Sequence, residues 1–316
     1  MKEILKQYVN IPSVAGREEG MENALRSKLG HIFEDVRTDN IGNLIMHKSG
    51  AGKKLLLCAP IDDFGIIVTY SGNGKTVLGA LGNTSESTFS SRRVGFFDGT
   101  GGVLMNGGKD ESDISKYEVF FGGDASQDGN PTLPKQSERG YFYPEFNEVG
   151  SEYVTGRGIK SKLGAALVTA LIIDEYKNGG LFADCDVTLI FYVQSKLDTK
   201  GITAASFGIS ADIAVIFDYT DVQNTDFIKG GLSLLLTSKR YVCPPEISSK
   251  LQKLISDKSI QVYTDSESVI CPEAALYCHA SGFAVCKLCF AVKDETVRIG
   301  GAVQSAKNVL HALISE

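Results

Sequence analysis

The spacing of hydrophobic residues predicts helices that alternate with buried strands over most of the chain. Met21, Leu25, Leu29, Ile32 and Phe33 recur at helical spacing and predict the first long helix. Further helices are expected at about 163–177, 202–207, 245–256 and 302–314, and strands at 44–46, 54–59, 187–193, 213–218 and 283–292. Strands separated by helices of this length predict an α/β fold with a three-layer α/β/α core.

The pattern changes between about residues 69 and 156. Helical periodicity stops there, and Gly, Ser, Thr and Asn interrupt short β-like runs such as residues 76–78. Such a segment is typical of a small β-rich domain inserted into the first one. We therefore expect a core formed by residues 1–68 and 157–316, and an inserted β-rich, dimerisation-type domain over residues 69–156.

Composition narrows the class of protein. The chain has 316 residues, enough for about two domains of ~150 residues each. Its 38 acidic and 32 basic residues leave a formal charge of −6, which argues against a nucleic-acid partner. No apolar run approaches the ~20 residues that span a membrane. Seven scattered cysteines and a start without an apolar leader segment predict a cytoplasmic location.

Common catalytic motifs are missing from the sequence. It contains neither G-x-S-x-G nor H-E-x-x-H, and it has four histidines. The glycines near residues 74 and 99–102 lack the spacing of a phosphate loop or a dinucleotide-binding loop. Serine hydrolases of the α/β type, zinc peptidases with the helical motif and nucleotide-binding enzymes are therefore disfavoured.

One segment carries a family resemblance. Residues 55–68, Leu-Leu-Leu-Cys-Ala-Pro-Ile-Asp-Asp-Phe-Gly-Ile-Ile-Val, resemble a signature of the glutamyl-aminopeptidase family, and residues 11–19, 38–44, 193–201 and 212–218 resemble its later landmarks in order. Members are dinuclear metallo-aminopeptidases that assemble as tetrahedral dodecamers, some formerly misnamed endoglucanases. The resemblance covers essentially the whole chain and implies a phosphorylase/hydrolase-like core with the inserted segment as a dimerisation domain.

The resemblance also assigns the metal site. Such enzymes hold two divalent ions, zinc or cobalt, about 3.5–4 Å apart, with a Glu as general base. Asp218 is the one metal ligand of the family that this sequence retains. Asp62 is retained at the position of the Asp that orients the first His ligand. The other positions carry Pro60 for the first His, Lys160 for the bridging Asp, Ser195 and Lys196 for the paired Glu residues, and Glu295 for the last His.

These substitutions lead us to expect a pseudo-peptidase without a catalytic residue and without a metal cofactor. Lys160 and Lys196 are expected to neutralise Asp62, Asp63 and Asp218 in a partly buried pocket, beside Lys162. The expected role is that of a binding or structural subunit, in a homo-oligomer of at least two chains or together with an active paralogue.

Two alternatives remain open from the residues alone. The chain could be an active aminopeptidase with a rearranged site built from Asp62, Asp63, Asp218, Glu273 or Glu295, and carboxylates of this kind suit Mg²⁺ or Mn²⁺ better than zinc. The lysine-lined pocket could instead bind or act on an anionic small molecule or a peptide, with one lysine as nucleophile.

Overall fold

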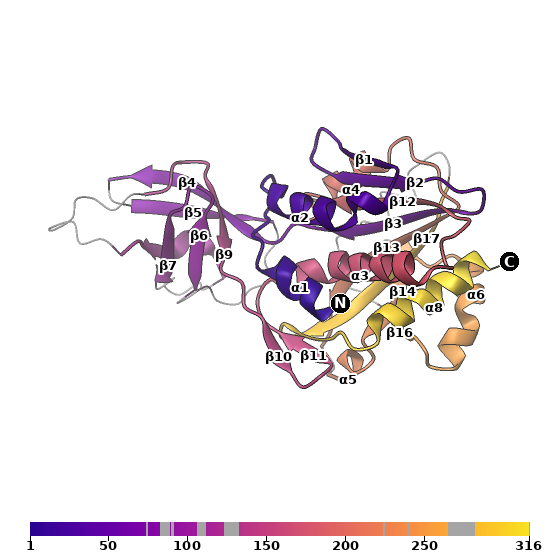
Figure 1. Ribbon diagram of the computed structural model, residues 1–316. Coiled ribbons are helices and arrows are strands. Elements are labelled where there is room, and N and C mark those ends of the chain that lie inside the picture. The colour runs from indigo at the N-terminus through magenta and orange to yellow at the C-terminus, as the bar shows by residue number, and fades with distance from the viewer. Residues whose placement is uncertain are drawn as a thin grey trace.

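The computed structural model shows a chain built on two separate sheets (Figure 1). It describes residues 1–73, 75–82, 89, 92–105, 112–122, 133–223, 225–238, 241–264 and 282–315. One sheet has 12 strands and belongs to the α/β part of the molecule, and the other has six strands. The α/β fold with a small sheet unit confirms the predicted fold class.

The large sheet is parallel in its middle and antiparallel at its edges. Its central strands lie in the order β12-β3-β13-β17 and are all parallel, so their carboxyl ends meet at one edge. The strands of this sheet are β1 (Asp35–Thr38), β2 (Leu44–Lys48), β3 (Lys54–Pro60), β10 (Asn147–Val149), β11 (Tyr153–Thr155), β12 (Asp186–Tyr192), β13 (Ile213–Asp221), β14 (Leu232–Ser238), β15 (Tyr241–Val242), β16 (Gln261–Thr264), β17 (Ala284–Lys293) and β18 (Thr296–Arg298).

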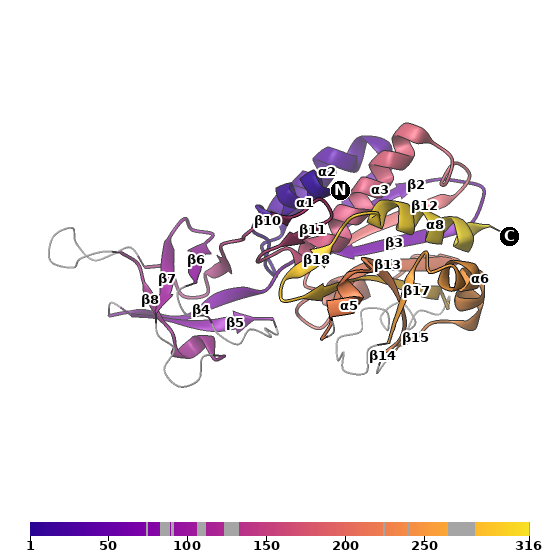
Figure 2. The same ribbon diagram turned by 90° about the horizontal axis from the view of Figure 1, so that it is seen from below.

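Helices cover the large sheet. α1, α2 and α3 lie together on one side of it (Figure 2). A Cβ at Gly164 of α3 would lie 2.1 Å from the Phe217 carbonyl oxygen, so glycine permits the close contact between α3 and β13. No helix in the described ranges is long and apolar enough to cross a membrane. The helices are α1 (Lys2–Val9), α2 (Glu19–Leu29), α3 (Leu163–Asn178), α4 (Lys200–Ala205), α5 (Thr225–Ile228), α6 (Pro245–Ser256) and α8 (Ala302–Ile314).

The small sheet lies apart from the α/β core and has its own apolar interior (Figure 1). All its paired neighbours are antiparallel, and side chains such as Val68, Leu78 and Phe96 are almost fully buried in it. Its strands are β4 (Gly65–Gly72), β5 (Lys75–Leu81), β6 (Arg93–Phe96), β7 (Gly101–Met105), β8 (Glu118–Phe120) and β9 (Arg139–Phe142).

The strands do not follow the domain boundaries expected at residues 68/69 and 156/157. β4 already begins at Gly65 and runs across residue 69, with a register shift between Val68 and Tyr70 in its pairing with β5. At the other end, β10 and β11 pair through β18 with the large sheet. We propose to place the limits of the inserted unit near Phe64 and Tyr143.

Candidate functional site

The predicted site residues cluster where the central parallel strands end. Asp62 follows β3 and is fully buried. Its Oδ1 accepts the Ser195 N–H at 2.8 Å and its Oδ2 accepts the Lys196 N–H at 3.1 Å. Asp62 therefore ties the loop after β12 to the end of β3, and both of its oxygens are engaged by backbone donors.

Lys196 is an ammonium held between two aromatic rings. Its Nζ lies 5.2 Å from the centroid of the Phe64 ring and 5.0 Å from that of Tyr219. Burial opposes the charge, but the neighbouring Tyr219, Asp218, Asp62 and Asp63 together raise the pKa of Lys196 above its ordinary value. The side chain is therefore a fixed cation, stabilised by ring faces and by carboxylates at longer range.

Lys160 is a second cation beside the same ring. Its Nζ lies 2.9 Å from Asp221 Oδ1 and 5.8 Å from the Tyr219 centroid. Burial alone would lower the pKa of Lys160, but the Asp221 carboxylate outweighs it and the net shift is upward. The position that the resemblance assigns to the bridging Asp thus carries a charged ammonium that is bonded to an acid.

A third lysine, Lys287, contacts Asp218, which the resemblance assigns as a metal ligand. Lys287 of β17 is 6% exposed, and its Nζ lies 3.6 Å from Asp218 Oδ2 of the neighbouring strand β13. Analysis of the sequence did not select Lys287, Tyr219 or Asp221. The signal for Lys287 was present, because it is the one charged residue within the apolar run of residues 284–292.

Lys162 points into the core and away from the other lysines. It is 1% exposed and donates to Ser13 Oγ and, at 2.6 Å, to the Ile61 carbonyl oxygen. Burial lowers the pKa of Lys162 to about 8, although Asp63 and Asp62 oppose that shift. We expected Lys162 and Asp62 to line the pocket, but both are enclosed behind it because their polar atoms bond to the chain.

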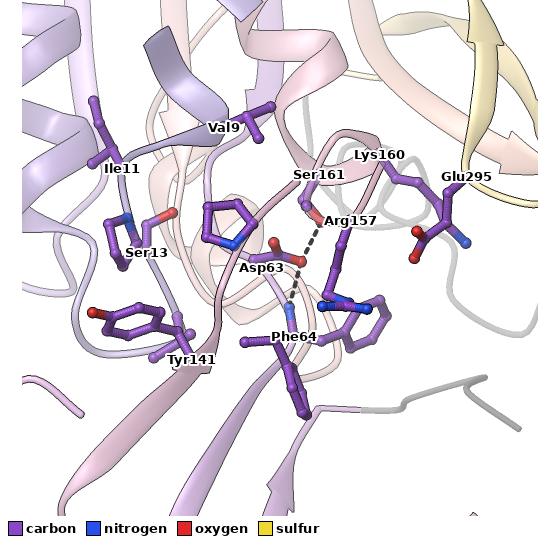
Figure 3. A pocket seen from close by; sticks show the side chains of 15 residues that line it. Val9, Ile11, Ser13, Asp63, Phe64, Tyr141, Arg157, Lys160, Ser161 and Glu295 are labelled. Carbon is purple, nitrogen blue, oxygen red and sulfur yellow. Dashed lines mark hydrogen bonds between the residues drawn. The ribbon is translucent and has the colours of Figure 1, made fainter. Parts of the chain in front are cut away.

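A cavity of about 50 Å³ lies at the junction of the two sheets (Figure 3). It brings together the predicted residues Asp63, Lys160 and Glu295, with Arg157 and Ser161 beside them. Asp63 Oδ1 accepts from Ser161 Oγ and from the Phe64 N–H, each at 2.8 Å. Glu295 belongs to the two-residue turn between β17 and β18, where its φ is +59°.

The remaining predicted positions hold no metal-binding cluster. Pro60 is the buried last residue of β3, and the buried Ser195 Oγ has no hydrogen-bond partner within the described ranges. Glu273 lies outside the described residues. Over the part of the chain that the structure describes, no three His, Cys, Asp or Glu side chains are grouped so that they could hold a metal ion.

Glu18 is a buried acid that sequence analysis placed only in a family landmark. It is 6% exposed, and its Oε1 accepts the N–H of Gln194 at 3.2 Å. Gln194 has a φ of +52°, in the left-handed region. Burial and the nearby Asp62 charge raise the pKa of Glu18 to about 7. Glu18 therefore connects the start of α2 to the loop that carries Lys196.

We expect Glu18→Gln to stabilise the protein above pH 7. The raised pKa means that folded Glu18 holds its proton between about pH 4.5 and 7 while the unfolded chain releases it. Stability therefore falls as the pH rises through this window, and the amide, which does not titrate, avoids a loss of about 2–3 kcal/mol. Urea unfolding at pH 5 and pH 8 measures the effect.

The exposed neighbour Glu19 supplies the matched control. Glu19→Gln is expected to change the free energy of unfolding by less than about 0.5 kcal/mol at either pH. Equal stability of wild type and Glu18→Gln at pH 8 would contradict the raised pKa of Glu18.

Two comparisons of sequence place this chain beside known proteins. The family model described as M42 glutamyl aminopeptidase matches residues 42–294. A putative aminopeptidase of Acetivibrio thermocellus is 26% identical over 265 residues, which cover 80% of this chain and 78% of that one. A lysyl aminopeptidase of Pyrococcus furiosus is 22% identical over 237 residues, covering 69% and 66% of the two chains.

Solved structures share the fold over the whole length. An aminopeptidase of Desulfurococcus kamchatkensis superposes with a TM-score of 0.85 at 17% identity, covering 99% of this chain and 94% of that one. The TET1 peptidase of Pyrococcus horikoshii, which can assemble into a tetrahedron or a large octahedral shell, gives a TM-score of 0.83 at 18% identity, with 99% of each chain covered.

Proposed function

The chain belongs to the M42 glutamyl aminopeptidase family, and we propose that it is a member that binds at this site without hydrolysing peptides. The observation that carries the proposal is the set of ammonium groups at the site. Lys160 contacts Asp221, Lys287 contacts Asp218, and Lys196 lies between two rings. Each cation stands at or beside a position that the resemblance assigns to a metal ligand.

Family membership corrects our expectation that no cofactor is involved. The family consists of metal-dependent aminopeptidases that use divalent ions, and this finding overturns the expectation of a member without a metal cofactor. The described residues do not fit two ions at the assigned positions, since Pro60 has no ligand atom in its side chain and Lys287 pairs with Asp218. No step of the proposal therefore passes through a metal ion.

An activity assay in the presence of metals tests the proposal directly. We expect the purified full chain to release no product above blank from leucyl-, lysyl- and glutamyl-p-nitroanilide, with Zn²⁺, Co²⁺ or Mn²⁺ added in turn. An active member of the family serves as the positive control. Turnover that a chelator abolishes would contradict the proposal and would favour the alternative of a rearranged site at Asp63, Asp218 or Glu295.

We also propose that the chain forms a homo-oligomer. Relatives assemble into a dodecamer or a tetrahedron. The small sheet of this chain exposes large apolar side chains on three strands, with Tyr70 45%, Met105 47% and Phe120 56% exposed. Exposed apolar groups that gather on one unit favour a protein–protein contact.

Light scattering after gel filtration is expected to give a mass of at least twice 34.0 kDa at micromolar concentration. Phe120→Asp should reduce that mass, because a charge placed in an apolar contact is costly to bury. A strict monomer for the wild type would contradict self-assembly. A mass that rises only on mixing with an active paralogue would instead identify the paralogue as the partner.

We keep the cytoplasm as the proposed location. The described cysteines Cys58, Cys185, Cys243 and Cys286 are buried free thiols. Buried cysteines that form no disulfide are typical of proteins in a reducing compartment.

A further inference from the structure

The cavity at the junction of the two sheets is lined by charges of both signs. Arg157 and Lys160 contribute cations, and Asp63 and Glu295 contribute carboxylates (Figure 3). The remaining wall is largely apolar and comes from Val9, Ile11, Pro12, Val14, Phe64, Tyr141, Phe142 and Pro144. A ligand in this cavity therefore contacts cationic side chains, carboxylates and an apolar surface.

Arg157 has a donor without a partner at this cavity. Its Nη1 makes long contacts of 3.4 Å to the Tyr143 carbonyl oxygen and 3.5 Å to Glu145 Oε1. Its Nε is buried, and within the described ranges it has no hydrogen-bond partner. A buried guanidinium N–H without an acceptor costs free energy unless a ligand or a water supplies one.

Asp63 has the complementary acceptor. Both hydrogen bonds that it accepts, from Ser161 and Phe64, go to Oδ1. Among the residues that the structure describes, Oδ2 has no partner, and it lies 3.3 Å from where a Cβ on Gly158 would stand. Glycine, with a φ of +83° at this position, leaves the approach to Oδ2 open.

The two unpartnered groups select a ligand that carries both charges. A simple anion on Arg157 would be repelled by Asp63 and Glu295, and a simple cation on Asp63 would leave the Arg157 Nε without an acceptor. We propose that this cavity binds a small apolar α-amino acid such as alanine, with its carboxylate on Arg157 and its ammonium on Asp63. The inference rests on the proposed function in that the site binds and does not cleave.

The size of the cavity limits the ligand. A volume of about 50 Å³ holds a few heavy atoms and not a peptide. Alanine is the smallest α-amino acid with an apolar side chain, and the larger side chain of leucine is expected to be disfavoured. The apolar wall beside Val9 and Pro144 is suited to a methyl group and contributes through burial of apolar surface.

Calorimetric titration of the full chain with four probes tests the ligand class. L-Alanine is expected to bind, and propionate and ethylamine, which each lack one of its charges, are expected to bind at least about tenfold more weakly. L-Leucine is also expected to bind more weakly than alanine. Equal affinity for alanine and propionate would overturn the zwitterion, and no heat with millimolar alanine would overturn the site.

Variants of Arg157 and Asp63 test whether these two residues bind the ligand. Arg157→Met and Asp63→Asn should each weaken alanine at least about tenfold, and Asp63→Asn keeps the Oδ1 acceptor for Ser161 and Phe64. Arg157→Lys should retain part of the affinity, because a cation remains. Arg298→Met, which removes an arginine paired with Glu152, is the matched control and should bind as wild type does.

Thermal unfolding of each variant shows whether it folds. A folded Arg157→Met protein that binds alanine as tightly as wild type would overturn the assignment of the carboxylate. Failure of the proposed function gives a different result. Peptide turnover in a protein that still binds alanine contradicts only the loss of hydrolysis, and absence of both turnover and binding contradicts only the ligand.

Discussion

Lys287→Met is expected to lower the free energy of unfolding by about 3 kcal/mol. The side chains of Lys287 and Asp218 are 8% and 15% exposed, and their charged atoms lie 3.6 Å apart. Removing one member of a buried pair leaves the other charge without compensation, and this loss typically exceeds the net contribution of the pair. Chemical denaturation of wild type and variant measures the difference.

A double-mutant cycle separates the ion pair from other effects of the methionine. Asp218→Asn keeps the Oδ1 acceptor for the Tyr219 N–H and removes the charge, so we expect the double variant to recover most of the loss. Lys229→Met is the matched control. Lys229 and Asp226 are 2.6 Å apart but 68% and 71% exposed, so that change should cost far less than Lys287→Met. Additive losses in the cycle would contradict the pairing of Lys287 with Asp218.

Restoration of the assigned ligands is expected to produce hydrolysis only when Lys287 is also replaced. The set Pro60→His, Lys160→Asp, Ser195→Glu and Lys196→Glu returns most of the side chains that the resemblance assigns to a dinuclear site. Lys287 would still neutralise Asp218 and repel a divalent ion nearby. Adding Lys287→Leu should raise cobalt-dependent release from leucyl-p-nitroanilide from the blank to at least about tenfold above it.

The fourfold variant with Lys287 intact is the control for this prediction. Equal activity of the fourfold and fivefold variants would show that Lys287 does not block the site. No activity in a folded fivefold variant would contradict the assignment of these positions. Each single reversal should remain inactive, because one new ligand still faces the other lysines.

Much of the core was predictable because its elements have a strong local signal. The helices expected at 245–256 and 302–314 match the bounds of α6 and α8, and the strand expected at 54–59 is β3. α1 was missed although its buried residues Leu5, Tyr8 and Val9 recur at helical spacing. β14 was missed although Gly230 and Gly231 mark a turn before it, because a short apolar run fits a strand and a buried helix segment equally well.

The site was predictable as a neighbourhood and not as a set of contacts. Loss of the family's ligands at Pro60, Lys160, Ser195 and Lys196 is visible from the order of residues alone. The pairing of Lys160 with Asp221 cannot be predicted from the order of residues. The two residues are 61 positions apart and meet only when their segments pack together. The inward direction of Lys162 likewise depends on the Ile61 carbonyl, which only the folded chain brings within reach.

The order of residues was enough to predict the alternation of helices and strands, a change to a β-rich pattern within the chain, and the family. Hydrophobic periodicity and short motifs are local properties, so neighbouring residues suffice to read them. Which lysine pairs with which carboxylate depended on the tertiary structure. Lys287 lies opposite Ile216 in the register of β13 and β17, and Asp218 is two residues further on the same face. That register arises from long-range packing of parallel strands, and no local pattern encodes it.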